Sequence, residues 1–335
     1  MSEILAHVIR GNTLESLHRG HIVVIDGEGR TIASAGDPGT VTYFRSACKS
    51  HQAIPLITSG AADAFGFAED EIAMACASHS GEPMHVEVVG RMLEKIGMTE
   101  SDLRCGTHFP FSETESRRMQ RAGENPSQLH NNCSGKHVGM LALAKHIGAD
   151  IDTYEEIDHR VQQRILRAIS EFTELPQGEI AFGIDGCAAP NFAVPITSMA
   201  RSFMNLVNPG KLHPAIQAAA ARIVSAMLRY PELIGGTERF DTLLMRAAHG
   251  RMISKVGAEG VWLGGVLPSQ QFPSGLAIAL KIEDGDDLYS RSVVAIDVLR
   301  QLGVLAPDDL AQLSPMPIKN RRDDKVGEIV SVLKI

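Results

Sequence analysis

Runs of consecutive apolar residues, separated by glycine, proline and serine, occupy both ends of the chain. In the segment 21–36, two such runs flank the sequence DGEG, which predicts a β-hairpin. The segment 251–282 contains three more runs (MISKV, VWLGGVL and GLAIALKI), which predict further strands. The segment 286–302 then has helical spacing and ends at Gly303.

Helical spacing of apolar residues dominates the middle of the chain. The segment 83–97 starts with proline and ends with glycine, as α-helices commonly do. The same spacing predicts helices over 133–148, 154–172, 199–207 and 214–229. The polar stretch 109–126 predicts a long loop that could act as a lid over a site.

This order of elements predicts an α/β (α+β) fold. Strands from the N- and C-terminal ends form one antiparallel sheet, and a largely helical region is inserted between them. We therefore expect a sheet-containing region of residues 1–45 plus 250–335, and a mostly helical region of residues 46–249.

Composition and charge narrow the class of protein. The chain has 335 residues, of which 44% are hydrophobic and 21% charged, so it is globular rather than disordered. Its net charge of −8 argues against a nucleic-acid partner. No apolar run is long enough to span a membrane, and the N-terminal end lacks a signal-peptide pattern. The five cysteines include no Cys-x-x-Cys pair, and we expect a cytoplasmic protein in a reducing compartment.

Two serine-containing strings are candidates for nucleophilic chemistry. In RSACKS, Ser46 and Lys49 lie three residues apart and share a helix face, so a desolvated lysine could activate the hydroxyl. A capping serine beside a solvated lysine explains the same spacing. In CASHSGE, Ser78 lies in a turn suited to exposed hydroxyls, although Ser80 as the cap of the next helix is an equal alternative.

Three further strings carry chemically useful side chains. In NNCSGKH, Cys133, Lys136 and His137 share a helix face, but two conventional ligands do not make a zinc site, and the glycine spacing excludes a phosphate-binding loop. Cys187 lies in a polar, glycine-flanked turn. In SKVG, Gly257 follows Lys255 closely enough to let a substrate approach the backbone, although an edge-strand lysine is the simpler interpretation. The other cysteines are expected to be small buried hydrophobes: Cys48, Cys76 and Cys105.

The combination of Ser-x-x-Lys, a serine-containing turn and a Lys-x-Gly strand resembles the plan of serine β-lactamases and serine-dependent glutaminases. Longer strings resemble the rhizobial-type, zinc-containing L-asparaginases of the asparaginase II family. This resemblance extends from about position 18 to the C-terminal VGEI and covers nearly the whole chain. The strings that carry it are RSACKSHQAIPLITSGAAD, CASHSGE, LRCGTHFP, NNCSGKHVGML, GIDGCAAPNFAVP and KIEDGD.

The resemblance implies residue roles. It implies two Ser-Lys pairs, Ser46 with Lys49 and Ser78 with Lys255. It also implies a Zn²⁺ cofactor held by two cysteines and an unusual lysine: Cys133, Lys136 and Cys187. The departures are Cys48, where a small residue such as alanine is expected, and Ser50-His51, where proline is common. No catalytic group is lost through these departures.

We therefore predict hydrolysis of L-asparagine to L-aspartate and ammonia, with Ser46 as the nucleophile. Arg45 is a suitable clamp for the substrate α-carboxylate because its guanidinium can bind bidentately. Asp185 could face the α-ammonium or support the metal, and His137 could do likewise. For Arg45, Asp185 and His137, solvated or capping roles explain the residues equally well.

Two other functions remain open at this point. One is a serine amidase of the same plan that acts on glutamine or on a β-lactam-like amide. The other is a zinc- or amino-acid-binding protein without activity, which the retention of both Ser-Lys pairs disfavours. The resemblance and the frequency of symmetric dimers among soluble enzymes also predict a homodimer.

Overall fold

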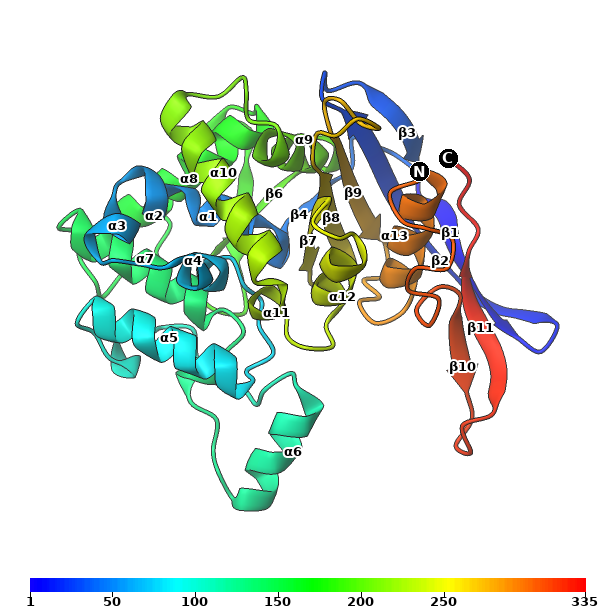
Figure 1. The fold of residues 1–335 in the computed structure, drawn as a ribbon, viewed down its shortest axis with the longest axis horizontal. Helices are drawn as coiled ribbons and strands as arrows, with labels where there is room; N and C mark the ends of the chain where they lie inside the picture. The colour runs from blue at the N-terminus through cyan, green and yellow to red at the C-terminus, as the bar shows by residue number, and fades with distance from the viewer. The chain divides into compact units, whose positions relative to one another are not determined.

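The computed structural model describes residues 1–335, which divide into two compact units. Unit 1 consists of Met1–Ala47, Ala193–Asn208 and Leu243–Ile335. Unit 2 consists of Cys48–Phe192 and Pro209–Thr242. Unit 1 contains the large sheet, and unit 2 contains most of the helices (Figure 1).

Unit 1 is built on an antiparallel sheet whose strands come from both ends of the chain. The strands are β1 (Glu3–Arg10), β2 (Thr13–Asp26), β3 (Thr31–Ala35), β7 (Met252–Gly257), β8 (Val261–Val266), β9 (Leu276–Ile282), β10 (Met316–Lys319) and β11 (Lys325–Ser331). Their order is β10-β11-β1-β2-β9-β8-β7, and β3 pairs with β2. The predicted fold class, a terminal-strand sheet with a helical insertion, is confirmed.

The local patterns explain this sheet. The DGEG turn joins β2 to β3 in an antiparallel hairpin, as predicted. Every residue of β7 and β8 is buried, which is typical of strands covered on both faces. The helices α9 (Ile196–Val207) and α13 (Ser290–Gln301) pack on the strands of this sheet. The short strand β4 (Val41–Tyr43) pairs with the end of β6 (Pro190–Pro195).

Unit 2 is a cluster of helices connected by short turns. They are α1 (Lys49–Gln52), α2 (Ile54–Thr58), α3 (Ala61–Ala64), α4 (Glu69–Ala75), α5 (Pro83–Lys95), α6 (Glu113–Ala122), α7 (Ser134–His146), α8 (Arg160–Thr173), α10 (Pro214–Arg229) and α11 (Pro231–Ile234). The strand β5 (Ala181–Ile184) and the helix α12 (Phe240–Ala247) complete the secondary structure, with short 3₁₀ turns at Arg45–Cys48, Glu100–Asp102, Gln128–His130 and Gln177–Glu179. None of the helices is both long and apolar enough to cross a membrane.

Two helix predictions show how local chemistry sets the boundaries. The helix predicted over 214–229 has those bounds in the structure, as α10. The helix predicted over 154–172 begins later, at Arg160, because the His159 side chain accepts a hydrogen bond from the Val161 N–H (3.1 Å) and caps the first turn. The residues before this cap form turns instead.

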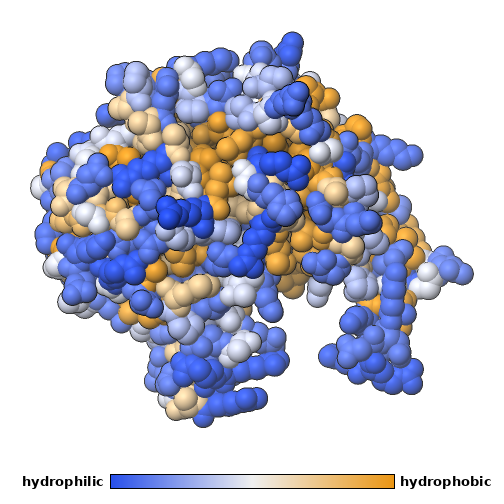
Figure 2. All heavy atoms as spheres, viewed as in Figure 1, coloured by the Kyte–Doolittle hydropathy of each residue, from blue (hydrophilic) through white to orange (hydrophobic).

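The prediction of a long loop over 109–126 was wrong, because α6 lies within it. Ser112 caps this helix by accepting from the Glu115 N–H, and Gly123 ends it in the left-handed conformation (φ 69°). Figure 2 shows hydrophilic residues over most of this segment. This helix has few apolar residues, so its caps are the clearest indication of it in the sequence.

Candidate functional site

Lys49 is buried at the start of α1, with three oxygen atoms around its Nζ atom. It donates to the carbonyl oxygens of Ala77 (2.7 Å) and Asn132 (3.1 Å), and it lies 2.9 Å from Ser78 Oγ. Only 1% of its surface is exposed. A lysine held this firmly by neutral oxygens is fixed in one orientation toward the Ser78 hydroxyl.

The number of N–H and O–H donors at this contact determines whether a proton can pass between Lys49 and Ser78. A carbonyl oxygen can only accept, so Ala77 and Asn132 each require one N–H from Lys49. An ammonium has one more N–H, which Ser78 Oγ would accept. A neutral amine instead has a lone pair, which would accept the Ser78 O–H. One proton can therefore pass between Lys49 and Ser78 while every heavy atom stays in place.

The turn that carries Ser78 is buried, and this corrects two expectations. The side chains of Ser78 and Ser80 are 4% and 2% exposed, whereas exposed hydroxyls were expected. The Ser78 N–H donates to the Ile234 carbonyl (2.8 Å), and Ser80 Oγ donates to the Gly235 carbonyl (2.7 Å). Ser80 does not cap α5 because Pro83 occupies the first helical position, which makes Glu82 the cap.

His79 connects the Ser78 turn to α7, and it was not among the site residues predicted from the sequence. Its Nδ1 atom accepts from the Gly81 N–H (3.1 Å), so the proton of the neutral ring lies on Nε2, which donates to Ser134 Oγ (2.8 Å). Burial lowers the pKa of His79 well below its ordinary value, which keeps the ring neutral. The histidine thus fixes the turn next to the first residues of α7.

A second cluster, of sulfur and nitrogen, lies at the N-terminal end of α7. Cys133 precedes this helix and Lys136 lies in its first turn, where its Nζ atom donates to Cys187 Sγ (3.0 Å). All three side chains are buried. The helix approaches α4 so closely that a Cβ atom on Gly135 would lie 2.3 Å from the Met74 carbonyl oxygen. Glycine is therefore required between the cysteine and the lysine.

Neighbouring groups within this cluster shift the pKa values of Cys187 and Lys136. A hydrogen bond from Cys133 lowers the pKa of Cys187 well below its ordinary value. Burial lowers the pKa of Lys136, but the adjacent Cys187 and Cys133 raise it by more, and Asp185 adds to the increase. Lys136 therefore donates to a sulfur atom, whereas the hydrogen-bond partners of Lys49 are oxygens.

The remaining cysteines behave as the expected small apolar residues. Cys48, Cys76 and Cys105 are all buried. Burial raises the pKa of Cys48 and of Cys105 to about 12, so both thiols stay protonated. The departure at Cys48 from the expected alanine therefore adds a neutral side chain.

His137 lies beside the sulfur cluster in a fixed orientation. Its Nδ1 atom is 2.7 Å from the hydroxyl of Tyr154, and that hydroxyl accepts from the Arg104 N–H (3.0 Å). Burial lowers the pKa of His137, and its interaction with Cys187 opposes that decrease. Tyr154 was not identified from the sequence because nothing near it in the chain relates it to α7.

The side chains of this cluster decide whether it can hold a metal ion. No group of three or more His, Cys, Asp or Glu side chains is arranged to hold one. Two buried cysteines and one buried lysine nevertheless come together at the end of α7. Thiolate sulfur and amine nitrogen are donors that zinc accepts, so the residues fit zinc only if Lys136 is the third ligand.

Lys255 lies on β7 in unit 1 and is fully buried. Its Nζ atom donates to the Val256 carbonyl (3.1 Å). Gly257 follows, and a Cβ atom there would lie 2.4 Å from the Phe44 carbonyl oxygen. The chain that approaches Gly257 is thus the backbone just before Arg45, rather than the substrate that the sequence suggested.

Arg45 and Ser46 lie in the 3₁₀ turn Arg45–Cys48, at the end of the first segment of unit 1. Arg45 has a positive φ of 51°, which is rare for a residue with a side chain. Its Nη1 atom lies 3.8 Å from Glu259 Oε1 in the turn between β7 and β8. Glu259 was not among the site residues predicted from the sequence.

The structure therefore groups the predicted site residues unit by unit. Unit 2 brings Lys49 to Ser78, and it brings Lys136 to Cys187. Unit 1 contains Arg45, Ser46 and Lys255. The predicted pairs Ser46–Lys49 and Ser78–Lys255 join residues of different units, and they stay predictions.

Comparisons with known proteins address the identity of the chain. The sequence profile of the L-asparaginase II family matches residues 6–331. No curated protein matches the chain. Among solved structures, it is similar to a probable glutaminase from Bacillus subtilis complexed with 6-diazo-5-oxo-L-norleucine, with 15% identity over 86% of this chain and 85% of that one and a TM-score of 0.40. It is also similar to a β-lactamase from Burkholderia ambifaria, with 14% identity over 84% and 93% of the two chains and a TM-score of 0.40.

Proposed function

We propose that this chain, which belongs to the L-asparaginase II family and is an amidohydrolase, hydrolyses the side-chain amide of L-asparagine to L-aspartate and ammonia. The family supports the reaction class and a small-molecule substrate. The observation that supports the catalytic route is the buried hydrogen bond between Lys49 and Ser78. Neither a cap nor a solvated lysine accounts for this contact.

In the first step, Ser46 Oγ attacks the amide carbon of the substrate. Lys49, three residues further along the chain, takes the hydroxyl proton as this bond forms. The carbon–nitrogen bond then breaks, and the leaving nitrogen needs a proton to depart as ammonia. Ser78 is hydrogen-bonded to Lys49 and is suited to deliver that proton.

In the second step, water attacks the ester on Ser46 and releases L-aspartate. Its proton returns along the same route, so that Ser46, Lys49 and Ser78 end in their starting states. We assign Lys255 to the positioning of Ser78 and of the attacking water. This assignment rests on the family resemblance, because Lys255 belongs to unit 1 and Ser78 to unit 2.

We assign Zn²⁺ to Cys133, Lys136 and Cys187. When bound, zinc would supply a Lewis acid that polarises the substrate or orients it. The residues of the chain hold this cluster in place: Gly135 lets α7 approach α4, and Tyr154 orients the ring of His137. Asp185 lies in the turn that carries Cys187 and contributes negative charge beside Lys136.

The substrate would be oriented by charge. The guanidinium of Arg45 is suited to the α-carboxylate because it can donate two parallel hydrogen bonds. Asp185 and His137 remain candidates for contact with the substrate or the metal.

The test is ammonia release from L-asparagine and L-glutamine by purified protein, before and after treatment with a chelator. We expect release from asparagine, a loss of activity after chelation and recovery with zinc. Faster release from glutamine would replace the proposed substrate, and release from neither amide would leave a binding protein. Intact-mass analysis of a trapped acyl-enzyme should find the added mass on Ser46, and its presence on Ser78 would reverse their roles.

We also expect a homodimer, as the family resemblance suggests. Light scattering on the purified protein would measure its mass. A monomer at working concentration would contradict this expectation without affecting the proposed reaction.

A further inference from the structure

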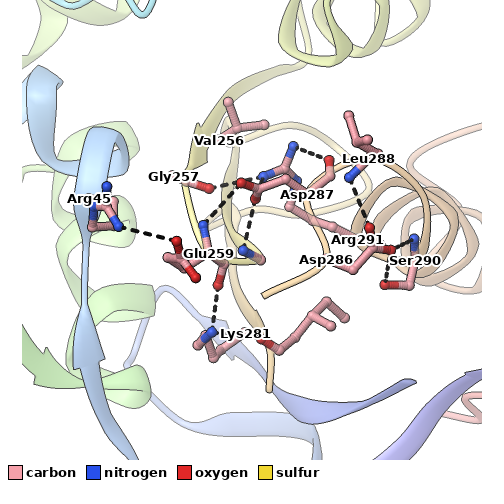
Figure 3. Close-up of polar contacts among 12 residues, drawn as sticks. Arg45, Val256, Gly257, Glu259, Lys281, Asp286, Asp287, Leu288, Ser290 and Arg291 are labelled. Atoms are coloured by element: carbon pink, nitrogen blue, oxygen red, sulfur yellow. Dashed lines mark hydrogen bonds and ion pairs between the residues drawn. The ribbon is translucent and has the colours of Figure 1, made fainter. Parts of the chain in front are cut away.

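The turn between β7 and β8 is held by side chains of α13 and of the segment before it. The carboxylate of Asp287 accepts from the N–H groups of Glu259 (3.1 Å) and Gly260 (2.8 Å). Arg291 pairs with Asp287 one helical turn later and donates to the Gly257 carbonyl (2.9 Å). Figure 3 shows these groups converging on the turn. The backbone at both ends of the turn is therefore anchored.

Glu259 is also fixed from the other side. Lys281 on β9 donates to the Glu259 carbonyl (2.5 Å). Glu259 has a positive φ of 63°, which matches its place in the tight turn between β7 and β8. Its backbone N–H and carbonyl are both engaged, so the direction in which its side chain leaves the turn is well defined. That side chain is directed at Arg45 (Figure 3).

The contact between Arg45 and Glu259 is a loose one. Nη1 of Arg45 lies 3.8 Å from Oε1 of Glu259, and the Glu259 side chain is 68% exposed. A guanidinium has five N–H donors in a fork, so one arginine can serve more than one carboxylate. Glu259 likewise keeps acceptor positions for a second cation.

We propose that Glu259 determines substrate specificity by binding the α-ammonium of the substrate while Arg45 binds its α-carboxylate. This inference rests on the proposed function and names the substrate class as free α-amino acids with a side-chain amide. In such a molecule both charges are attached to one carbon. A carboxylate on Arg45 therefore brings the ammonium next to the acidic side chain that already approaches the same arginine.

The same geometry rejects a substrate that lacks the ammonium. Its carboxylate on Arg45 would lie near the carboxylate of Glu259 with no cation between them, and like charges at short range repel. Glu259 would thus favour the zwitterion and disfavour the simple acid. If Glu259 only occupied Arg45 in competition with substrate, its removal would improve the binding of both.

The experiment compares L-asparagine with succinamate, which is asparagine without its α-amino group. Ammonia release from both is measured for the wild type, Glu259→Gln and Glu259→Asp. Glu28→Gln is the matched control, because Glu28 is also an exposed turn glutamate beside an arginine of unit 1. Thermal unfolding of each variant verifies that it is folded.

We expect Glu259→Gln to raise KM for asparagine by roughly tenfold with kcat changed much less, since one charged hydrogen bond to substrate is lost. KM for succinamate should stay the same or fall. Glu259→Asp should recover part of the loss, and Glu28→Gln should behave as the wild type.

Two results would overturn the inference. One is an unchanged or lower KM for asparagine in Glu259→Gln, and the other is an equal rise in KM for asparagine and for succinamate. A wild-type protein that releases no ammonia from asparagine would instead reject the proposed function itself, and these two failures are distinguished before any variant is made.

Discussion

Replacement of Lys49 by methionine tests the centre of the proposed reaction. Methionine has a similar length and volume but no N–H group, so the cavity stays filled while the base is removed. The Ala77 and Asn132 carbonyls lose the donor that each has in the wild type. The Ser78 hydroxyl loses the nitrogen that lies 2.9 Å away.

The cost to folding can be worked from these contacts. An unsatisfied buried hydrogen-bonding group costs about 1–3 kcal/mol, so two carbonyls set a range of about 2–6 kcal/mol. Burial of an amine is itself unfavourable, and its removal offsets part of this loss. We expect a net destabilisation of about 2 kcal/mol, which lowers the melting temperature and leaves the protein folded at 25 °C.

The effect on catalysis should be larger. Loss of a general base lowers the rate by about 10²–10⁴-fold, which corresponds to about 3–5 kcal/mol in the barrier. We expect this loss in kcat, with KM changed only a few-fold. Lys145→Met is the matched control, because Lys145 also donates to a carbonyl in unit 2 but lies outside the site. A folded Lys49→Met variant whose kcat stays within about threefold of wild type would refute the role of Lys49 as base.

Three further predictions concern packing, protonation and metal binding. A Cβ atom on Gly135 would lie 2.3 Å from the Met74 carbonyl oxygen, whereas one on Gly90 in α5 would have no atom within 4 Å. In denaturant unfolding, Gly135→Ala should therefore destabilise the protein by about 1–3 kcal/mol, and Gly90→Ala should stabilise it by up to about 1 kcal/mol. If both substitutions changed the free energy of unfolding in the same direction, the close approach at Gly135 would be contradicted. Burial lowers the pKa of His85 below its ordinary value, so the unfolded chain binds more protons near pH 6 and stability should fall as the pH drops below about 6.5. Calorimetry should find a smaller fall in His85→Gln, and an identical profile would exclude His85 as the cause. Elemental analysis of wild-type protein should find about one zinc per chain and of Cys187→Ser much less, and equal contents would reject the assigned ligands.

The features that could be predicted from the sequence are those encoded by neighbouring residues. The DGEG hairpin and the helix over 214–229 depend on spacing within a few positions, and both have the expected form. The placement of Cys133 and Lys136 at one end of a helix is local in the same way. Spacing alone could not identify Cys187 as their neighbour, because it lies 51 positions after Lys136.

Expectations failed where a neighbour distant in sequence controls the local chemistry. The Ser78 turn was expected to expose its hydroxyls, but it is buried, and the carbonyl oxygens of Ile234 and Gly235 accept hydrogen bonds from it. For Gly257, substrate approach and an edge-strand position were both open; β7 is the last strand of the sheet order, and the Phe44 carbonyl lies where a Cβ atom of residue 257 would be. In both cases the local sequence marked a position with an unusual backbone or polar environment, but it did not identify the residue that contacts that position.

The two buried lysines of unit 2 show why the partner decides the chemistry. Lys49 and Lys136 are the same residue type, and both follow a serine or cysteine by three positions. The nitrogen of Lys49 has three neutral oxygens around it. Two are carbonyl oxygens, which can only accept, and the third is the Ser78 hydroxyl, which can accept a proton from Lys49 or donate one to it. The nitrogen of Lys136 donates to Cys187 Sγ. Cys187 and Cys133 raise the pKa of Lys136, which opposes the loss of its proton. Lys49 is therefore the lysine suited to proton transfer. Lys136, which donates to Cys187 Sγ, is instead suited to the ligand role proposed for it.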